Sequence, residues 1–116
     1  MDNALVIGAS GGIGAALADR LDAKHFVTRL SRRDDGLDVT DPVSVVRVMN
    51  RIEGPVHLAF IATGILAPDG HAPEKALDAI DADAMARTFA VNAIGPALIL
   101  QHLAPLLADD ARVGVL

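Results

Sequence analysis

Short apolar runs alternate along the chain with segments whose apolar positions recur at helical spacing. The runs Asn3–Ile7, His25–Leu30 and Val56–Ile61 predict buried strands, because a strand covered on both faces of a parallel sheet need not alternate polar and apolar residues. Two helices are predicted from apolar stripes, one made of Ile13, Ala16, Leu17 and Leu21 and the other of Val45, Val48, Met49 and Ile52.

Boundary signals support this division of the chain. We expect Asp41 to cap the second helix, Pro42 to open it, and Gly54-Pro55 to end it. A polar turn is predicted at 32–36, a loop at 62–81, a long helix from about Ala82 to Leu107, and a further strand at Arg112–Leu116. Strands that alternate with helices predict an α/β fold, a Rossmann-type doubly wound parallel sheet in one domain, residues 1–116.

A short third strand is also predicted at Leu37–Thr40, and it creates a conflict. Only about six residues join it to the strand that ends at Leu30, whereas a parallel crossover needs a dozen or more. We therefore expect the usual connecting helix to be missing and the third strand to be irregular.

The most informative motif is the glycine-rich segment Gly8-Ala9-Ser10-Gly11-Gly12-Ile13-Gly14, which follows a predicted strand and opens a predicted helix. Glycines let the backbone approach a diphosphate closely, and the free N–H groups of the helix's first turn favour an anion. The spacing fits both GxxxGxG and GxxGxxG. The alternative interpretation is a tight strand-to-helix turn that binds nothing, but the strand, loop and helix context favours a dinucleotide.

The end of the second predicted strand indicates which dinucleotide binds. Proteins of this fold that bind NAD place a carboxylate there to hold the ribose 2′-OH, but this chain has Ser31, Arg32 and Arg33. A guanidinium matches a phosphate in charge and geometry, which favours NADP over NAD. The alternative is a solvated basic turn.

Composition narrows the function further. The 116 residues are 52% hydrophobic and 22% charged, with a net charge of −5, so duplex nucleic acid and anionic membranes are poor partners. The apolar runs look too short to span a bilayer and no leader precedes the first strand, so a cytoplasmic location is expected. The chain has no Cys, and its four His are scattered, so we expect no metal site. It also has no Tyr and no Trp.

The sequence resembles the short-chain dehydrogenase/reductase family over the whole chain, and within it the bacterial C-factor-like members. The resemblance is carried by the glycine-rich segment, Ser31-Arg32-Arg33, Leu37-Asp38-Val39-Thr40-Asp41, Ile61-Ala62-Thr63-Gly64 and Val91-Asn92-Ala93-Ile94-Gly95-Pro96. It implies an oxidoreductase that transfers hydride between a nicotinamide and a carbonyl or alcohol carbon of a small substrate. It implies that Gly8, Ser10, Gly11, Gly12, Ile13 and Gly14 hold the diphosphate. Arg32, with Ser31 and Arg33 beside it, would contact the 2′-phosphate. Asp38 and Val39 would contact the adenine, and the segment Ala62, Thr63 and Gly64 would run along the bound cofactor. Separately, we expect a homo-oligomer, because the long helix from about Ala82 is apolar on more than one face and must be buried or paired.

Asn92 matches the asparagine that supports the family's proton relay. Asn92 stands on an apolar helical stripe, and a buried amide must find hydrogen-bond partners. The alternative role is therefore to satisfy the backbone of its own helix where Gly95-Pro96 kinks it, and the two roles are compatible. In the family, Ser, Tyr and Lys of the relay follow the strand predicted at Arg112–Leu116. The resemblance therefore implies a domain that is incomplete on its C-terminal side and inactive alone.

Two other functions stay open. The segment Ile61-Ala62-Thr63-Gly64 lacks both asparagines of the family's NNAG pattern, and GxxGxxG spacing is also typical of nucleotide-sugar epimerases. The missing tyrosine would equally suit a non-catalytic module that binds NADP.

Overall fold

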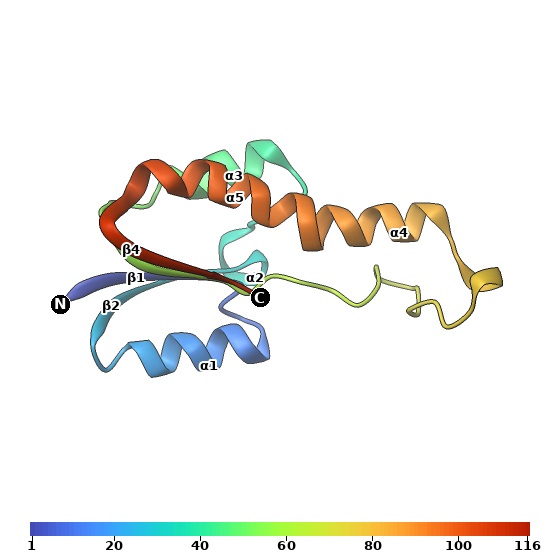
Figure 1. The fold of residues 1–116 in the computed structure, drawn as a ribbon, viewed down its shortest axis with the longest axis horizontal. Helices are drawn as coiled ribbons and strands as arrows, with labels where there is room; N and C mark the ends of the chain where they lie inside the picture. Colours follow the sequence, from blue (N-terminus) through green and yellow to red (C-terminus); the bar gives the residue numbers. More distant parts are fainter.

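A four-stranded parallel sheet organises the chain in the computed structural model, which describes residues 1–116 (Figure 1). Its strand order is β2-β1-β3-β4, with β1 at Asp2–Ile7, β2 at His25–Leu30, β3 at Val56–Ile61 and β4 at Leu107–Val115. Helix α1 covers one face, whereas α3 and α5 cover the other. The predicted α/β class and parallel sheet are confirmed.

The two faces of the sheet are packed unequally. The face under α3 (Pro42–Met49) and α5 (Gly95–Leu103) carries a cluster of 13 buried apolar residues, among them Leu5, Ile61 and Ile99. Helix α3 buries the predicted Val45, Val48 and Met49, and Asp41 caps it by accepting the Val43 N–H at 3.0 Å. The α1 face is thin, with a cluster of only three buried residues, Val6, Ala9 and Ala18.

Helix α1 (Gly12–Leu21) uses only the Leu17 and Leu21 part of the apolar stripe that the sequence predicts: both are half-buried, and Leu21 packs against that three-residue cluster. It turns Gly14 and Ala18 toward the sheet, while Ile13 is 66% exposed and Ala16 is also exposed. The reason is a close helix–strand approach, because a Cβ on Gly14 would overlap the Gly8 carbonyl. Small residues therefore face the strand, and the larger ones lie at the flanks.

The predicted third strand at Leu37–Thr40 is wrong. Residues Arg32–Asp35 form a one-turn helix, α2, where the sequence predicts a turn, and the segment after it joins no strand. Leu37 and Val39 are buried in the core instead, and the Ser44 hydroxyl accepts the Asp38 N–H at 2.9 Å. The segment therefore packs on the face of the sheet that α3 and α5 cover. Because it is not a strand, no parallel crossover has to fit between Leu30 and Leu37, and β2 is an edge strand.

The long predicted helix is present but interrupted. It consists of α4 (Ala82–Phe89), a π-helical segment (Ala90–Ile94), α5 and a 3₁₀ turn (Ala104–Leu106). The π segment adds a residue to one turn and shifts the helical phase. The apolar stripe that the sequence predicts is made of Met85, Phe89, Asn92, Pro96, Ile99 and Leu103. Its second half, Pro96, Ile99 and Leu103, is buried as predicted, whereas Phe89 and Asn92 before the phase shift are exposed.

Length and composition alone would allow this helix to cross a membrane. The segment Ala82–Leu106 spans 25 residues, which corrects the expectation that every apolar run is too short. Buried helices of soluble proteins meet the same two criteria, and here Ile99 and Leu103 are fully buried against the sheet. The feature therefore does not distinguish a membrane helix from a core helix.

Strand β4 begins earlier than the sequence predicts, at Leu107 instead of Arg112. Its register against β3 shifts between the pairs Val56–Leu107 and Leu58–Arg112, so the pairing of the two strands is irregular there. Asp109 and Asp110, which the sequence assigns to a solvated turn, are exposed within this irregular part of the strand.

Candidate dinucleotide site

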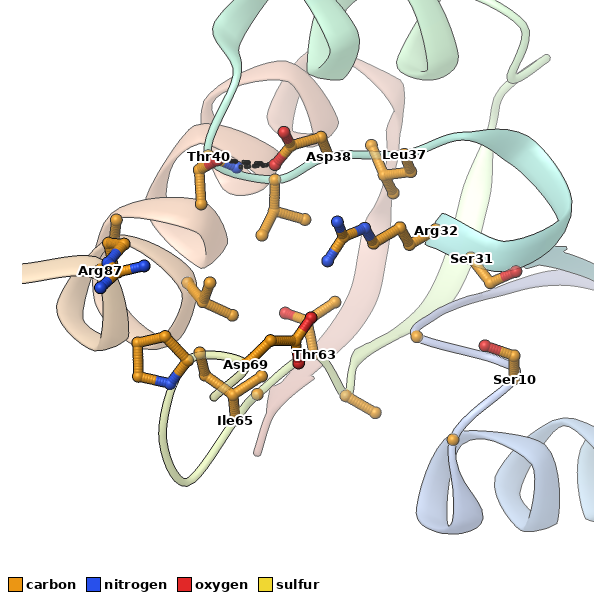
Figure 2. Close-up of a pocket in the computed structure, with 18 of the residues that line it drawn as sticks. Ser10, Ser31, Arg32, Leu37, Asp38, Thr40, Thr63, Ile65, Asp69 and Arg87 are labelled. Carbon is orange, nitrogen blue, oxygen red and sulfur yellow. Dashed lines mark hydrogen bonds between the residues drawn. The ribbon is translucent and has the colours of Figure 1, made fainter. Parts of the chain in front are cut away.

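A cavity of about 510 Å³ opens where β1, β2 and β3 end (Figure 2). Ligands of doubly wound folds bind at this edge of the sheet. The cavity is lined by ten of the residues that the sequence nominates, namely Gly8, Ser10, Gly11, Ser31, Arg32, Asp38, Val39, Ala62, Thr63 and Gly64. Five other nominated residues do not line it, namely Gly12, Ile13, Gly14, Arg33 and Asn92.

The glycines of the loop have different physical roles. Gly8 has φ +88° and a Cβ there would meet the Ala62 carbonyl oxygen at 2.7 Å, so the β1–β3 edge requires glycine. Gly14 permits the close approach of α1. A Cβ on Gly12, by contrast, would meet no protein atom within 4 Å. The protein's own packing therefore explains Gly8 and Gly14 but gives no reason for glycine at position 12.

The first backbone N–H groups of α1 have no hydrogen-bond partner in the protein. Its N-cap, Gly11, offers no side-chain acceptor, and the first helical bond is donated by the Ala15 N–H to the Gly11 carbonyl at 2.8 Å. The amides of Gly12, Ile13 and Gly14 donate to no carbonyl in the structure. Helices α3 and α4 are capped by aspartates instead. An anion at this helix start would meet three free N–H groups and the positive end of the helix dipole.

The three residues after β2 are placed differently from one another. Ser31 is buried, and its hydroxyl accepts the Asp34 N–H at 3.0 Å, so this side chain caps α2. Arg32 extends from the first turn of α2 into the cavity, as Figure 2 shows. Arg33 lies outside, 81% exposed, with its nearest carboxylate, that of Asp34, at 4.0 Å. The capped turn therefore presents one guanidinium to the cavity.

Asp38 and Val39 form the wall beyond Arg32. The Asp38 carboxylate accepts hydrogen bonds from the Thr40 hydroxyl at 2.6 Å and the Thr40 N–H at 3.0 Å. The hydroxyl, and then the N–H, hold the pKa of Asp38 below its ordinary value, with a small contribution from the positive charge of Arg32. Both Thr40 bonds reach the Oδ1 atom, which leaves Oδ2 without a protein donor.

Asn92 fastens the loop after β3. Its Oδ1 accepts the Ile65 N–H and its Nδ2 donates to the Ile65 carbonyl, both at 2.8 Å. The amide is exposed and bonds to the loop, which corrects the expectation of a buried group that satisfies its own kinked helix. It lines a smaller hollow of about 380 Å³ beside the main cavity, together with Thr63 and Leu116.

The far end of the cavity holds residues that the sequence analysis missed. Pro68 and Asp69 come from the loop after β3, and Arg87 comes from α4. No local pattern in the sequence distinguishes Arg87 from the other arginines of the chain. The structure contains no group of three or more His, Cys, Asp or Glu side chains arranged to hold a metal ion.

The chain is similar in fold to several solved structures whose own chains are considerably longer. One small-chain dehydrogenase is 25% identical with a TM-score of 0.85, and another, in complex with NADPH, is 24% identical with a TM-score of 0.82. A putative short-chain dehydrogenase/reductase from Burkholderia multivorans with bound NADP is 20% identical with a TM-score of 0.79. They match 98%, 98% and 99% of this chain, which spans only 58%, 49% and 58% of theirs.

Sequence comparison assigns the family. No curated protein matches the chain significantly, and none of the comparisons supports a particular likeness to the C-factor-like members. The family model that does match is described as the NAD dependent epimerase/dehydratase family and aligns with residues 4–101, which include the glycine-rich loop, Arg32 and Asn92. With the parallel sheet and the cavity at its edge, this match identifies the chain as an NAD(P)-binding Rossmann portion that belongs to the NAD dependent epimerase/dehydratase family.

Proposed function

We propose that this chain binds NADP(H) as the cofactor-binding part of a short-chain oxidoreductase. The observation that carries the proposal is the single cavity that joins the glycine-rich loop to the guanidinium of Arg32. The free amides at the start of α1 suit a diphosphate, and the open space beside Gly12 leaves room for it. Arg32 suits a 2′-phosphate, because a guanidinium and a phosphate pair through charge-assisted hydrogen bonds.

Different residues of the chain would hold different parts of the cofactor. Gly11 and Gly12 would let the backbone approach the diphosphate, Arg32 would neutralise the 2′-phosphate, and Asp38 Oδ2 would accept a hydrogen bond from the adenine amino group. The bound nicotinamide supplies hydride chemistry. Asn92 would hold the loop beside it through Ile65. These 116 residues include no tyrosine, so a phenolic proton donor is not among them.

The description of the matching family favours a second candidate, an epimerase-like enzyme that uses the same cofactor site. The two candidates differ in a measurable way. Reduction of a carbonyl consumes NADPH, whereas epimerisation returns the nicotinamide to its starting redox state. Two of the similar solved structures are described with NADPH or NADP bound, which supports the phosphorylated cofactor for either candidate.

Arg32→Ala tests the proposed role of the cavity. We expect wild-type chain to bind NADPH more tightly than NADH, and the variant to lose about 1.5–3 kcal/mol of NADPH affinity while NADH affinity is nearly unchanged. Calorimetric titration with both cofactors measures this. Arg33→Ala is the matched control, because Arg33 lies outside the cavity and should have a much smaller effect. Equal losses for the two cofactors in Arg32→Ala would contradict a phosphate contact.

A further inference from the structure

The cofactor cavity has a guanidinium at each end. Arg32 enters from α2 near the glycine-rich loop, and Arg87 enters from α4 at the opposite end (Figure 2). Neither side chain takes part in an ion pair in the structure. The cavity wall also includes the apolar side chains of Val39 and Val91 and the carboxylates of Asp38 and Asp69. The cavity therefore has a guanidinium donor at each end and apolar side chains in its wall.

Two contacts orient the Arg87 side chain. Its Nε donates to the Asp83 carbonyl at 3.4 Å, and one terminal nitrogen lies 3.2 Å from His71 Nε2. Arginine only donates, so the His71 Nε2 atom is the acceptor in this contact. The His71 contact joins α4 to the loop that supplies Pro68 and Asp69 to the cavity. The second terminal nitrogen of Arg87 makes no hydrogen bond to protein.

We propose that Arg87 is a base-contacting residue of the cofactor site, donating from its guanidinium to the purine of the bound dinucleotide. This inference rests on the proposed function. With the 2′-phosphate at Arg32, the part of the cavity walled by Val39 and Val91 is the place for the flat base. A purine offers ring nitrogens that only accept hydrogen bonds, which matches a guanidinium edge. Arg87 then contributes to affinity for the part of the molecule that NADPH and NADH share, whereas Arg32 serves only NADPH.

Titration of Arg87→Met with NADPH and with NADH tests this assignment. We expect Kd to rise roughly 5- to 10-fold for both cofactors, as for loss of a charged donor's hydrogen bond. Arg87→Lys, which keeps the charge but not the planar fork, should fall between wild type and Arg87→Met. Arg20→Met, on the exposed surface of α1 and away from the cavity, is the matched control and should change neither Kd. Thermal melting of each variant confirms that the fold is kept.

The outcomes separate this inference from the proposal on which it rests. A loss confined to NADPH would make Arg87 a phosphate contact and overturn the base assignment. Unchanged affinities in Arg87→Met would overturn it as well, while leaving the NADP site in place. A wild-type chain that binds neither cofactor would overturn the proposed function and this inference together.

Discussion

At the residue scale, substitutions of two glycines in the same motif should have different effects: one should abolish dinucleotide binding and the other should lower the stability of the fold. Gly12→Val places a branched side chain where the protein has no atom within 4 Å, so the fold should survive while dinucleotide binding is lost. Gly14→Ala pushes a Cβ into the Gly8 carbonyl and should lower the free energy of unfolding by about 1–3 kcal/mol. Urea unfolding and NADPH titration of both variants measure the two effects. Tight NADPH binding by folded Gly12→Val would place the ligand elsewhere.

Asp38, in the cavity wall, should make the stability of the fold depend on pH, mainly through its hydrogen bonds with Thr40. Its pKa is lowered in the folded chain, mainly by the Thr40 hydroxyl, so ionised Asp38 stabilises the fold above its unfolded-state pKa. This contribution is lost as pH falls through the lower, folded-state pKa. Thr40→Val should raise the pKa of Asp38 and cost roughly 0.5 kcal/mol of stability at neutral pH, because solvent screens an exposed group. The cost should vanish in acid.

Carbon-detected NMR titration of the Asp38 carboxyl reads this pKa directly, and urea unfolding at neutral and acidic pH reads the stability. Ser10→Ala is a suitable comparison, because Ser10 lines the same cavity but makes no hydrogen bond to Asp38. A pKa of Asp38 that is the same in Thr40→Val and wild type would assign the shift to the backbone N–H or to Arg32 instead.

At the element scale, the sequence predicts most helices and strands because their signals are local. The apolar runs of β1 and β3 and the Asp41-Pro42 start of α3 depend only on neighbouring residues, and the structure places them as expected. The strand predicted at Leu37–Thr40 is wrong because Leu37 and Val39 pack into the core without pairing with a strand. This packing depends on tertiary contacts, which β propensity does not reveal. The α1 stripe misleads for a similar reason, since a close backbone approach selects Gly14 and Ala18.

The π segment explains what could and could not be foreseen about Asn92. Gly95-Pro96 signals a disturbed helix, and Pro96 has no N–H to donate to the preceding turn. The amide's partner, Ile65, lies 27 positions earlier in the chain, so no local pattern identifies it. Arg87 and Asp69 were missed similarly, because only the folded positions of α4 and of the loop after β3 bring them to the cavity. Motif residues of the loop could be nominated, whereas residues that complete the walls from other elements could not.

At the scale of the whole molecule, the shape is extended and the apolar surface is uneven. The chain measures 52 × 27 × 25 Å, and α4 with its preceding loop projects past the ends of the strands (Figure 1). Phe89, at the end of α4, is 60% exposed, and Ile94, at the end of the π-helical segment that follows, is 56% exposed. Val115 and Leu116 are 51% and 62% exposed at the end of the chain. Strands β2 and β4 are both edge strands with unpaired backbone groups.

We therefore expect the 116-residue chain to self-associate in solution. A projecting helix with exposed Phe89 and Ile94 gains stability when a second copy covers it, because burial of such side chains contributes about 1.5–3 kcal/mol each. Light scattering after size exclusion, over a range of concentrations, measures the mass. Phe89→Ser with Ile94→Ser should shift the chain toward monomer, whereas Val43→Ser, an exposed apolar residue on α3 and away from this helix, should not. A wild-type monomer at all concentrations would show that the exposed helix face alone does not drive association.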